Sequence, residues 1–164
     1  MGCLEDGIVR MQEGLEVFRT TDAVHLSPYF SSLLAEAQGE AGRPEQGLDL
    51  FAGLDPAREP FWQAELHRVN GELILRRAAR QTSKLDSETE AENCFRQALA
   101  IAQRQRAKSF ELRGAMSLSR LLLGQGRSAE AYNLMTNIYN WFTEGFDTAD
   151  LKDAKVLLEE LSSR

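Results

Sequence analysis

The sequence predicts an all-α fold built from helical hairpins, and three observations lead to this prediction. The apolar residues are dominated by 23 Leu and 19 Ala, against 5 Val and 4 Ile, in a chain of 164 residues. Residues without branching at Cβ keep their rotamer freedom in a helix, so this bias favours helices over strands. Only 4 Pro are present. Finally, small and large apolar residues recur at helical spacing with a period near 40 residues, which is typical of repeat architectures.

Each copy of the repeat begins with a small residue that is followed four positions later by a large apolar one. The successive steps between copies are 40, 44 and 40 residues. A third residue follows three positions further on, and spacing i, i+4, i+7 places all three on one helix face. We therefore expect a neighbouring helix to pack closely on that face, with Phe95 deeply buried. The four rows are Gly7, Met11 and Gly14; Gly47, Phe51 and Leu54; Ala91, Phe95 and Ala98; and Ala131, Met135 and Ile138.

Eight helices are expected in a single domain, 1–164. Glycines at 42, 124 and 126 can end a helix, Pro44 suits the first turn of the next one and Ser128 suits an N-cap. The polar run 81–87 is expected to be a solvent loop, and Trp141, Phe142 and Phe146 are expected to seal the last junction. The predicted elements are a half repeat at 5–19, then hairpins 27–54 (27–41 and 44–54), 60–105 (60–80 and 87–105) and 108–143 (108–124 and 128–143), and a C-terminal capping helix at 148–162.

The string Ala91-x3-Phe95-x2-Ala98-Leu99 resembles the second helix of a tetratricopeptide repeat (TPR). HEAT repeats match the period of 40 to 44 residues better than the TPR unit of roughly 34 residues, so a TPR reading requires lengthened helices or loops. The residue pattern favours the TPR alternative. That resemblance implies a right-handed α-α superhelix of TPR-like hairpins.

A second resemblance covers nearly the whole chain. It is similar to the C-terminal helical-repeat region of large bacterial proteins that join an adenylate-cyclase-like domain to a predicted ATPase. The residues that carry it include Trp62-x-Ala64-Glu65-Leu66-His67-Arg68, Ala91-Glu92-x-Cys94-Phe95-Arg96, and Trp141-Phe142-Thr143-Glu144-Gly145-Phe146-Asp147. The resemblance implies a regulatory or partner-binding role in nucleotide signalling. The cyclase and ATPase domains are absent here, so the chain is either a fragment or a short stand-alone relative.

Composition narrows the classes of partner. The 19 basic and 25 acidic residues leave a net charge of −6, whose average field repels nucleic acid and anionic membranes. No run approaches the roughly 18 apolar residues of a membrane span, and the N-terminal residues lack a secretory pattern, so we expect a cytoplasmic protein. Cys3 and Cys94 have neither a close pair nor a companion His at metal spacing, which argues against a disulfide framework and a zinc site.

The sequence carries no motif for catalysis, and we expect no cofactor. The turn 124–128 lacks the Lys that a phosphate-binding loop needs. Glu65 and His67 are two residues apart and so point to different helix faces. Cys94, next to the predicted core residue Phe95, has the setting of a buried and unreactive thiol. We therefore predict a non-enzymatic interaction module. The alternative is a small enzyme or ligand-responsive unit with a pocket between helices.

Two surfaces are predicted to bind other proteins. Stacked hairpins form a concave face from the first helix of each pair, and arginines there can fork to the carboxylates of a protein or peptide partner. The alternative is that these arginines only solvate the fold. The predicted concave-face residues are Tyr29, Arg68, Glu72, Arg76, Arg113, Met116 and Arg120.

The second surface lies on the unpaired first helix, where an apolar row lacks a covering element. Exposed apolar rows mark association sites, so we expect self-association, most simply as a twofold homodimer. The alternative is that Leu15 and Phe18 are consumed by packing on the second helix. The predicted self-association residues are Ile8, Met11, Leu15 and Phe18.

Overall fold

A computed structural model describes residues 2–21, 26–52, 54, 60–80 and 84–163. Within these residues the chain forms eight α-helices and no strand, so the all-α prediction is confirmed. The helices are α1 (Gly2–Arg19), α2 (Ser27–Glu40), α3 (Pro44–Phe51), α4 (Gln63–Ala78), α5 (Lys84–Gln105), α6 (Lys108–Gly124), α7 (Ser128–Tyr139) and α8 (Ala149–Ser162).

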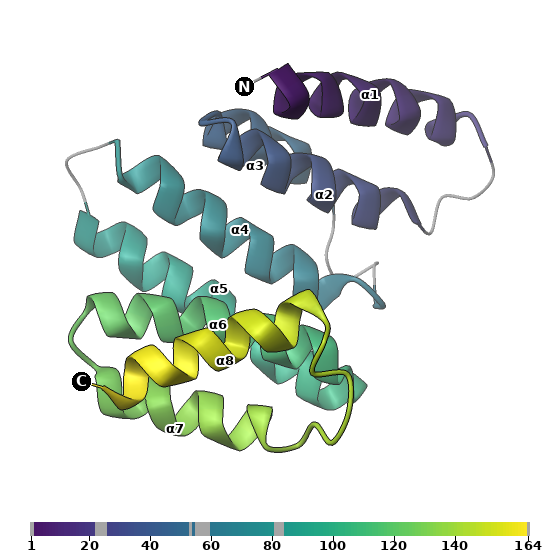
Figure 1. Cartoon of the computed structure of the whole chain (residues 1–164). Coiled ribbons are helices and arrows are strands. Elements are labelled where there is room, and N and C mark those ends of the chain that lie inside the picture. The colour runs from purple at the N-terminus through teal and green to yellow at the C-terminus, as the bar shows by residue number, and fades with distance from the viewer. Residues whose placement is uncertain (1, 22–25, 53, 55–59, 81–83, 164) are drawn as a thin grey trace.

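The helices form a stack in which successive helices reverse direction (Figure 1). Each helix packs on the next one in the sequence, and the even-numbered helices also contact one another in turn: α2 with α4, α4 with α6, and α6 with α8. The stack therefore has an inner row of even-numbered helices. The surface that α2, α4, α6 and α8 form together is called the even-helix face below. At the ends of the stack lie α1, which packs chiefly on α2, and α8, which packs on α6 and α7.

Most helix ends lie close to the predicted ones, but several differ by three or four residues, and α1 begins at Gly2 and α4 at Gln63 instead of 5 and 60. Helices α3 and α7 are shorter than expected, ending at Phe51 and Tyr139. Residues 84–87 belong to α5 rather than to a loop, because this stretch contains no Gly or Pro and Asp86 favours the positive end of the helix. Ser128 is the first helical residue instead of the N-cap, which is Arg127. Residues 81–83, in the predicted loop 81–87, and residue 53, in the predicted helix 44–54, lie outside the described residues.

Two hairpin turns are built in the same way, 84 residues apart. Gly42 and Gly126 both have a φ of +78°, in the left-handed region where glycine is the least strained residue. After each glycine, an arginine N–H donates back to a carbonyl of the preceding helix, from Arg43 to Gln38 and from Arg127 to Leu122, both at 2.8 Å. The turn closes α2 and α6 and starts α3 and α7 in the same geometry, as the repeat predicts.

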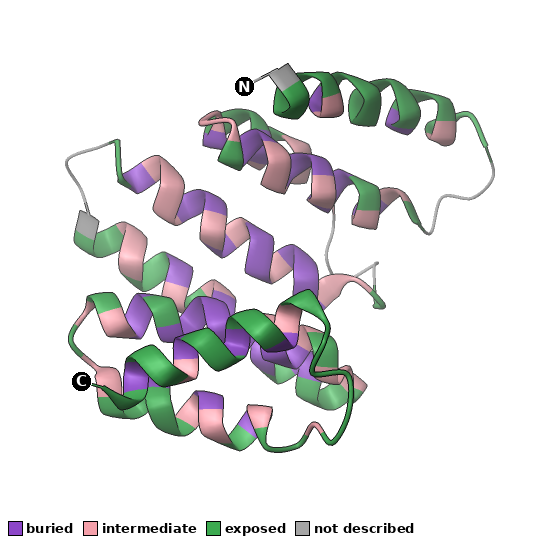
Figure 2. Cartoon of the chain, viewed as in Figure 1, coloured by how far each residue is buried: buried purple, intermediate pink, exposed green. Residues whose placement is uncertain are grey.

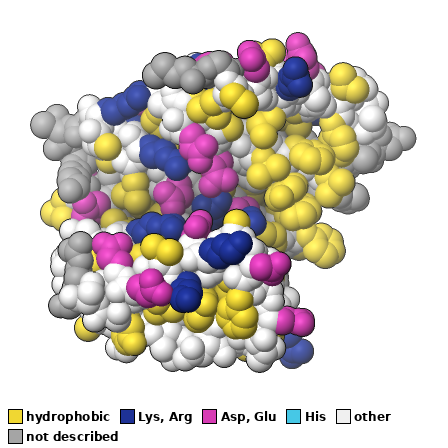
Figure 3. Space-filling view, viewed as in Figure 1, with side chains coloured by type: hydrophobic (Ala, Val, Ile, Leu, Met, Phe, Trp, Pro, Cys, Tyr) yellow, Lys and Arg dark blue, Asp and Glu magenta, His cyan; other side chains and the backbone are white. Residues whose placement is uncertain are grey.

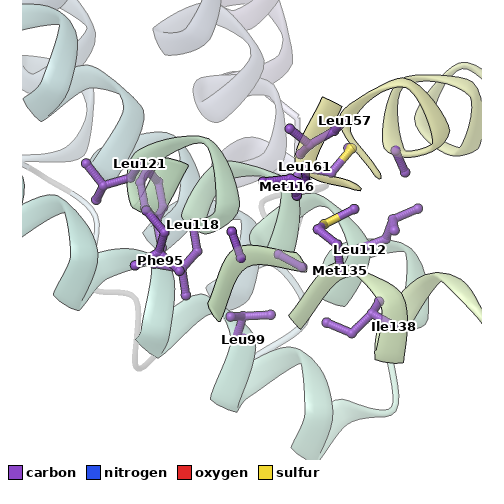
Figure 4. Close-up of a cluster of buried hydrophobic side chains, with 14 of the residues drawn as sticks. Phe95, Leu99, Leu112, Met116, Leu118, Leu121, Met135, Ile138, Leu157 and Leu161 are labelled. Atoms are coloured by element: carbon purple, nitrogen blue, oxygen red, sulfur yellow. The ribbon is translucent and has the colours of Figure 1, made fainter. Parts of the chain in front are cut away.

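The largest hydrophobic core joins helices α4 to α8 around Phe95 (Figure 4). Phe95 is 0% exposed, which confirms its predicted burial. It lies against Gly71 of α4, where an added Cβ would stand 2.6 Å from the ring, so only glycine permits this approach. Burial is densest along α4 and α6, whereas α1 and the outer side of α8 are mostly exposed (Figure 2).

The first helix does not leave its whole apolar row free. Ile8 and Leu15 are buried against Leu34 of α2, so the predicted exposure of these two side chains is wrong. They lie on the side of α1 that faces α2, because their positions are offset by one residue from the row of Gly7, Met11 and Gly14. Met11 is 42% exposed and Phe18 is partly exposed.

The junction between α7 and α8 is less sealed than the sequence suggested. Trp141 and Phe146 are exposed, and only Phe142 packs partly against the core. Trp141 instead packs edge-to-face with Phe142, with ring centroids 5.2 Å apart, and Nζ of Lys108 lies 5.4 Å from the centroid of the Trp141 ring. The core side of α8 is closed by Leu151, Ala154, Leu157 and Leu161.

Candidate interaction face

The predicted concave-face arginines lie on the even-helix face, but two of them are held in an ion-pair chain. Arg68 of α4 donates to Glu65 at 2.7 and 3.0 Å and to Glu36 of α2 at 2.9 Å. Arg113 of α6 donates to Asp150 of α8 at 2.7 Å and to Glu65 at 3.4 Å. The chain of charges therefore links four helices, and it alternates in sign.

Burial makes the centre of this chain a structural unit. Glu65 is 2% and Arg68 8% exposed. Burial by itself lowers the pKa of Arg68, but the hydrogen bonds and charge of Glu65, followed by those of Glu36, outweigh it and raise that pKa. A buried charge that loses its partner is strongly destabilising. The Arg68 guanidinium is therefore buried in ion pairs with Glu65 and Glu36. This burial contradicts the prediction that Arg68 contacts a partner.

Two further predicted residues are occupied by internal packing. Met116 is buried on α6 and belongs to the core cluster with Leu157 and Leu161 of α8, because α8 lies across this part of α6 (Figure 4). This contact contradicts its predicted exposure on the concave face. Tyr29 is half-buried and stacks on Trp62, with ring centroids 4.4 Å apart.

Glu72, Arg76 and Arg120 remain at the surface of α4 and α6. Arg120 is exposed, and Glu72 accepts a hydrogen bond from Ser117 at 2.7 Å. These two residues line a pocket of about 240 Å³ with Leu75, Glu88 and Ser117. Arg76 is half-buried, and its Nη1 has no hydrogen-bond partner among the described residues. Neither Arg76 nor Arg120 has an ion pair in the described part of the chain.

An aromatic row along one edge of the stack was not predicted. Phe18, Phe30, Tyr29, Trp62 and Phe110 follow one another with ring centroids 4.4 to 6.1 Å apart. In the sequence, four of them lie at or near the start of α2, α4 or α6, a regularity that could have revealed the row. Next to it is an apolar pocket of about 750 Å³ lined by Leu26, Pro60, Phe61, Trp62, Gln105, Ala107 and Phe110.

Charge and apolar surface are separated on this side of the molecule. Lys, Arg, Asp and Glu side chains gather over the middle of the stack, and hydrophobic side chains gather beside them, where α1 ends and α2 begins (Figure 3). Phe61, at the rim of the apolar pocket, is 78% exposed. A partner that lies along α4 would thus meet an apolar zone at one end and charged groups farther along.

His67 and Cys94 occupy structural positions, whereas Cys3 is an exposed free cysteine. Burial lowers the pKa of His67, which lines a pocket with Leu48, Phe51 and Asn70. Burial also raises the pKa of the Cys94 thiol, whose sulfur accepts a hydrogen bond from Asn70 at 3.6 Å, so the thiol is held in its neutral form. Within the described ranges, no group of three or more His, Cys, Asp or Glu side chains is placed to hold a metal ion.

No protein-family model, curated protein or solved structure matches the chain. The TPR resemblance stays a prediction from residues such as Ala91, Phe95 and Ala98. Among the described residues, none of the helices combines the length and the apolar character needed to cross a membrane.

Proposed function

We propose that the chain is a non-enzymatic interaction module, a right-handed TPR-like superhelix that binds a peptide or a neighbouring domain on its even-helix face. The contacts of α2 with α4, α4 with α6 and α6 with α8 support this proposal, because stacked hairpins of this kind present one helix of each pair to a partner. The resemblance to the bacterial cyclase-ATPase proteins suggests a nucleotide-signalling system as the setting.

The observation that carries the proposal is a pair of arginines that have no ion pair among the described residues. Arg76 and Arg120 are the predicted concave-face arginines that remain after Arg68 and Arg113 are taken up by Glu65 and Asp150. An Arg guanidinium presents a planar fork of donors that matches a carboxylate, and its hydrogen bonds to ions are stronger than neutral ones. The module therefore suits a partner with an acidic side chain or a terminal carboxylate at this point.

The apolar pocket beside Trp62 offers a second anchor. Trp62 and Arg76 stand at opposite ends of α4, and fourteen residues of helix correspond to about 21 Å along the axis. An extended peptide covers that distance with roughly six or seven residues. We therefore propose a linear partner segment with one large apolar side chain and an acidic residue about six positions away. Aromatic and aliphatic anchors in pockets supply most of the affinity of such contacts.

A peptide library tests this function directly. Random twelve-residue peptides displayed on phage are selected on the immobilised protein, and the enriched sequences are expected to combine an acidic residue with a large apolar one. A fluorescent peptide made from an enriched sequence should lose at least tenfold in affinity, by anisotropy, for Arg76→Glu/Arg120→Glu.

The matched control changes the charge equally on the outer side of α8. Lys152 and Lys155 are exposed there, and Lys152→Glu/Lys155→Glu should bind like the wild type. An equal loss of affinity in both double variants would mean that net charge alone causes the effect, which would contradict a specific role of Arg76 and Arg120. Unchanged affinity of the arginine variant would refute the proposed binding face. A thermal-shift screen with nucleotides and metabolites tests the ligand-responsive alternative, which a reproducible rise in melting temperature would favour.

A further inference from the structure

The four repeated rows are not equally covered. In α5, Ala91, Phe95 and Ala98 are each at most 1% exposed, and the corresponding row of α7 is also buried. In α1, the equivalent Met11 is 42% exposed and Gly14 is exposed. One sequence pattern is therefore a core contact in two helices and open surface in a third.

The buried rows of α5 and α7 show which kind of element packs on such a row. The helix that precedes α5 places Gly71 on Phe95, and the helix that precedes α7 donates a hydrogen bond from Ser119 to the carbonyl of Ala131 at 3.3 Å. In each case a helix packs antiparallel on the row. In the described part of the chain no helix packs on the row of α1 in this way, and Met11 is exposed.

The second wall of this open site comes from α2. The two equivalent turns are 84 residues apart, and the same offset makes Leu33 of α2 equivalent to Ser117 of α6. Ser117 points toward the preceding even-numbered helix, where it donates a hydrogen bond to Glu72 of α4. Leu33 therefore faces the position that a preceding helix would occupy. The resulting apolar cavity has a volume of about 250 Å³ and is called the α1–α2 seat. It is lined by Met11, Gly14, Leu15, Phe18, Phe30 and Leu33.

The shape of the seat is self-complementary. Met11 is 42% exposed, and Gly14, one turn away, lines the cavity and has open space where a Cβ would stand, so a large side chain (the knob) lies beside a notch. A twofold axis between these two positions sets each knob into the other copy's notch, since isologous contacts pair a surface with itself.

Charge supports the same pairing. Arg10 and Glu13 lie together on one side of the row, both are exposed, and neither has an ion pair among the described residues. An antiparallel arrangement of two α1 helices brings Arg10 close to the partner's Glu13, and the symmetry forms this pair twice. The outer side of α8 is the other open helix surface at an end of the stack, and apart from Val156, which is 65% exposed, it carries the charged residues Lys152, Asp153 and Lys155. That polar surface does not fit an apolar seat, which disfavours head-to-tail assembly.

We propose that a second copy of this chain fills the α1–α2 seat, forming a twofold dimer in which the two α1 helices pack antiparallel. Met11 of each protomer enters the notch at the partner's Gly14, so the partner's α1 covers the row as α4 covers that of α5. This surface lies apart from Arg76 and Arg120, so the inference stands or falls separately from the proposed peptide-binding role.

Sedimentation velocity of the full chain between about 1 and 200 µM tests the dimer, a range suited to a small interface. The wild type should shift from monomer to dimer across it. Met11→Glu should remain a monomer throughout, because it places a charge in the apolar seat. Val9→Glu is the matched control, since Val9 is exposed on the opposite side of α1, and it should dimerise like the wild type. Circular dichroism should show equal helicity for all three proteins.

Cross-linking tests the geometry. In a Cys3→Ser background, Gly14→Cys should form a disulfide-linked dimer under mild oxidation, and Val9→Cys should form it at least tenfold more slowly. A wild type that stays monomeric at every concentration would overturn the proposal. So would dimerisation of Met11→Glu at wild-type strength, or equal cross-linking rates at positions 9 and 14.

Discussion

Phe95 offers the most direct test of the packing, because its environment predicts a large loss of stability on truncation. The ring is 0% exposed and lies against Gly71, with Ala91 and Ala98 on the same helix face. Phe95→Ala loses about 2–3 kcal/mol of transfer free energy from the buried ring. A residual cavity of about 80 Å³ adds roughly 2 kcal/mol at about 24 cal/mol per Å³. Gly71, Ala91 and Ala98 have no side chain long enough to fill the cavity that the missing ring would leave.

The expected loss in the free energy of unfolding is therefore about 4–5 kcal/mol, in the upper part of the range of about 3–5 kcal/mol that buried aromatic truncations cost. Urea denaturation followed by circular dichroism at 222 nm measures it, with every variant at one protein concentration so that self-association does not bias the comparison. Phe146→Ala is the control: this ring is exposed at the α7–α8 junction, and its loss should cost less than about 1 kcal/mol. If Phe95→Ala unfolds within about 1 kcal/mol of the wild type, the repeat row does not form the core contact described here.

Two further predictions concern buried charge and pH. Arg68→Met should destabilise the fold by about 3–5 kcal/mol because it leaves Glu65 buried without its closest partner. In the same urea assay, Arg68→Met/Glu65→Met should recover most of that loss. Equal stability of the single and double variants would contradict the ion-pair account. Burial lowers the folded-state pKa of His67 below its ordinary value of 6.5, so the unfolded chain binds more protons in the window between the two values, and stability should fall as the pH drops below about 6.5. The urea midpoint of His67→Gln should therefore fall less between pH 7.5 and 5.5 than that of the wild type, and parallel pH dependences would exclude a role for His67.

The helices and the equivalence of their rows could be predicted from the sequence because the determinants are local. Helical periodicity depends on residues three and four positions apart, and the turns depend on residues such as Gly42, Pro44 and Gly126, whose backbone preferences act without distant contacts. The same reasoning was wrong where local preference was ambiguous. Residues 84–87 are polar except for Leu85 but contain no helix breaker, and they form the first turn of α5.

The interaction surfaces depended on tertiary structure. Arg68 and Arg113 had the same sequence signature as Arg76 and Arg120, namely an arginine on the first helix of a hairpin. Whether one of these arginines is paired depends on contacts between residues far apart in the sequence. Arg68 and Glu36 are separated by 32 positions, Arg113 and Asp150 by 37, and Arg113 and Glu65 by 48.

The exposed row of α1 shows the same division between sequence and structure. Its sequence pattern is the one that buries Phe95, yet Met11 is 42% exposed because no described helix packs on it. The physical reason is that a row of small and large residues specifies how closely a helix can approach, as Gly71 does on Phe95. Whether a helix is there to approach is a property of the assembled stack, so the sequence alone determined the contact surface and the tertiary structure decided whether it is occupied.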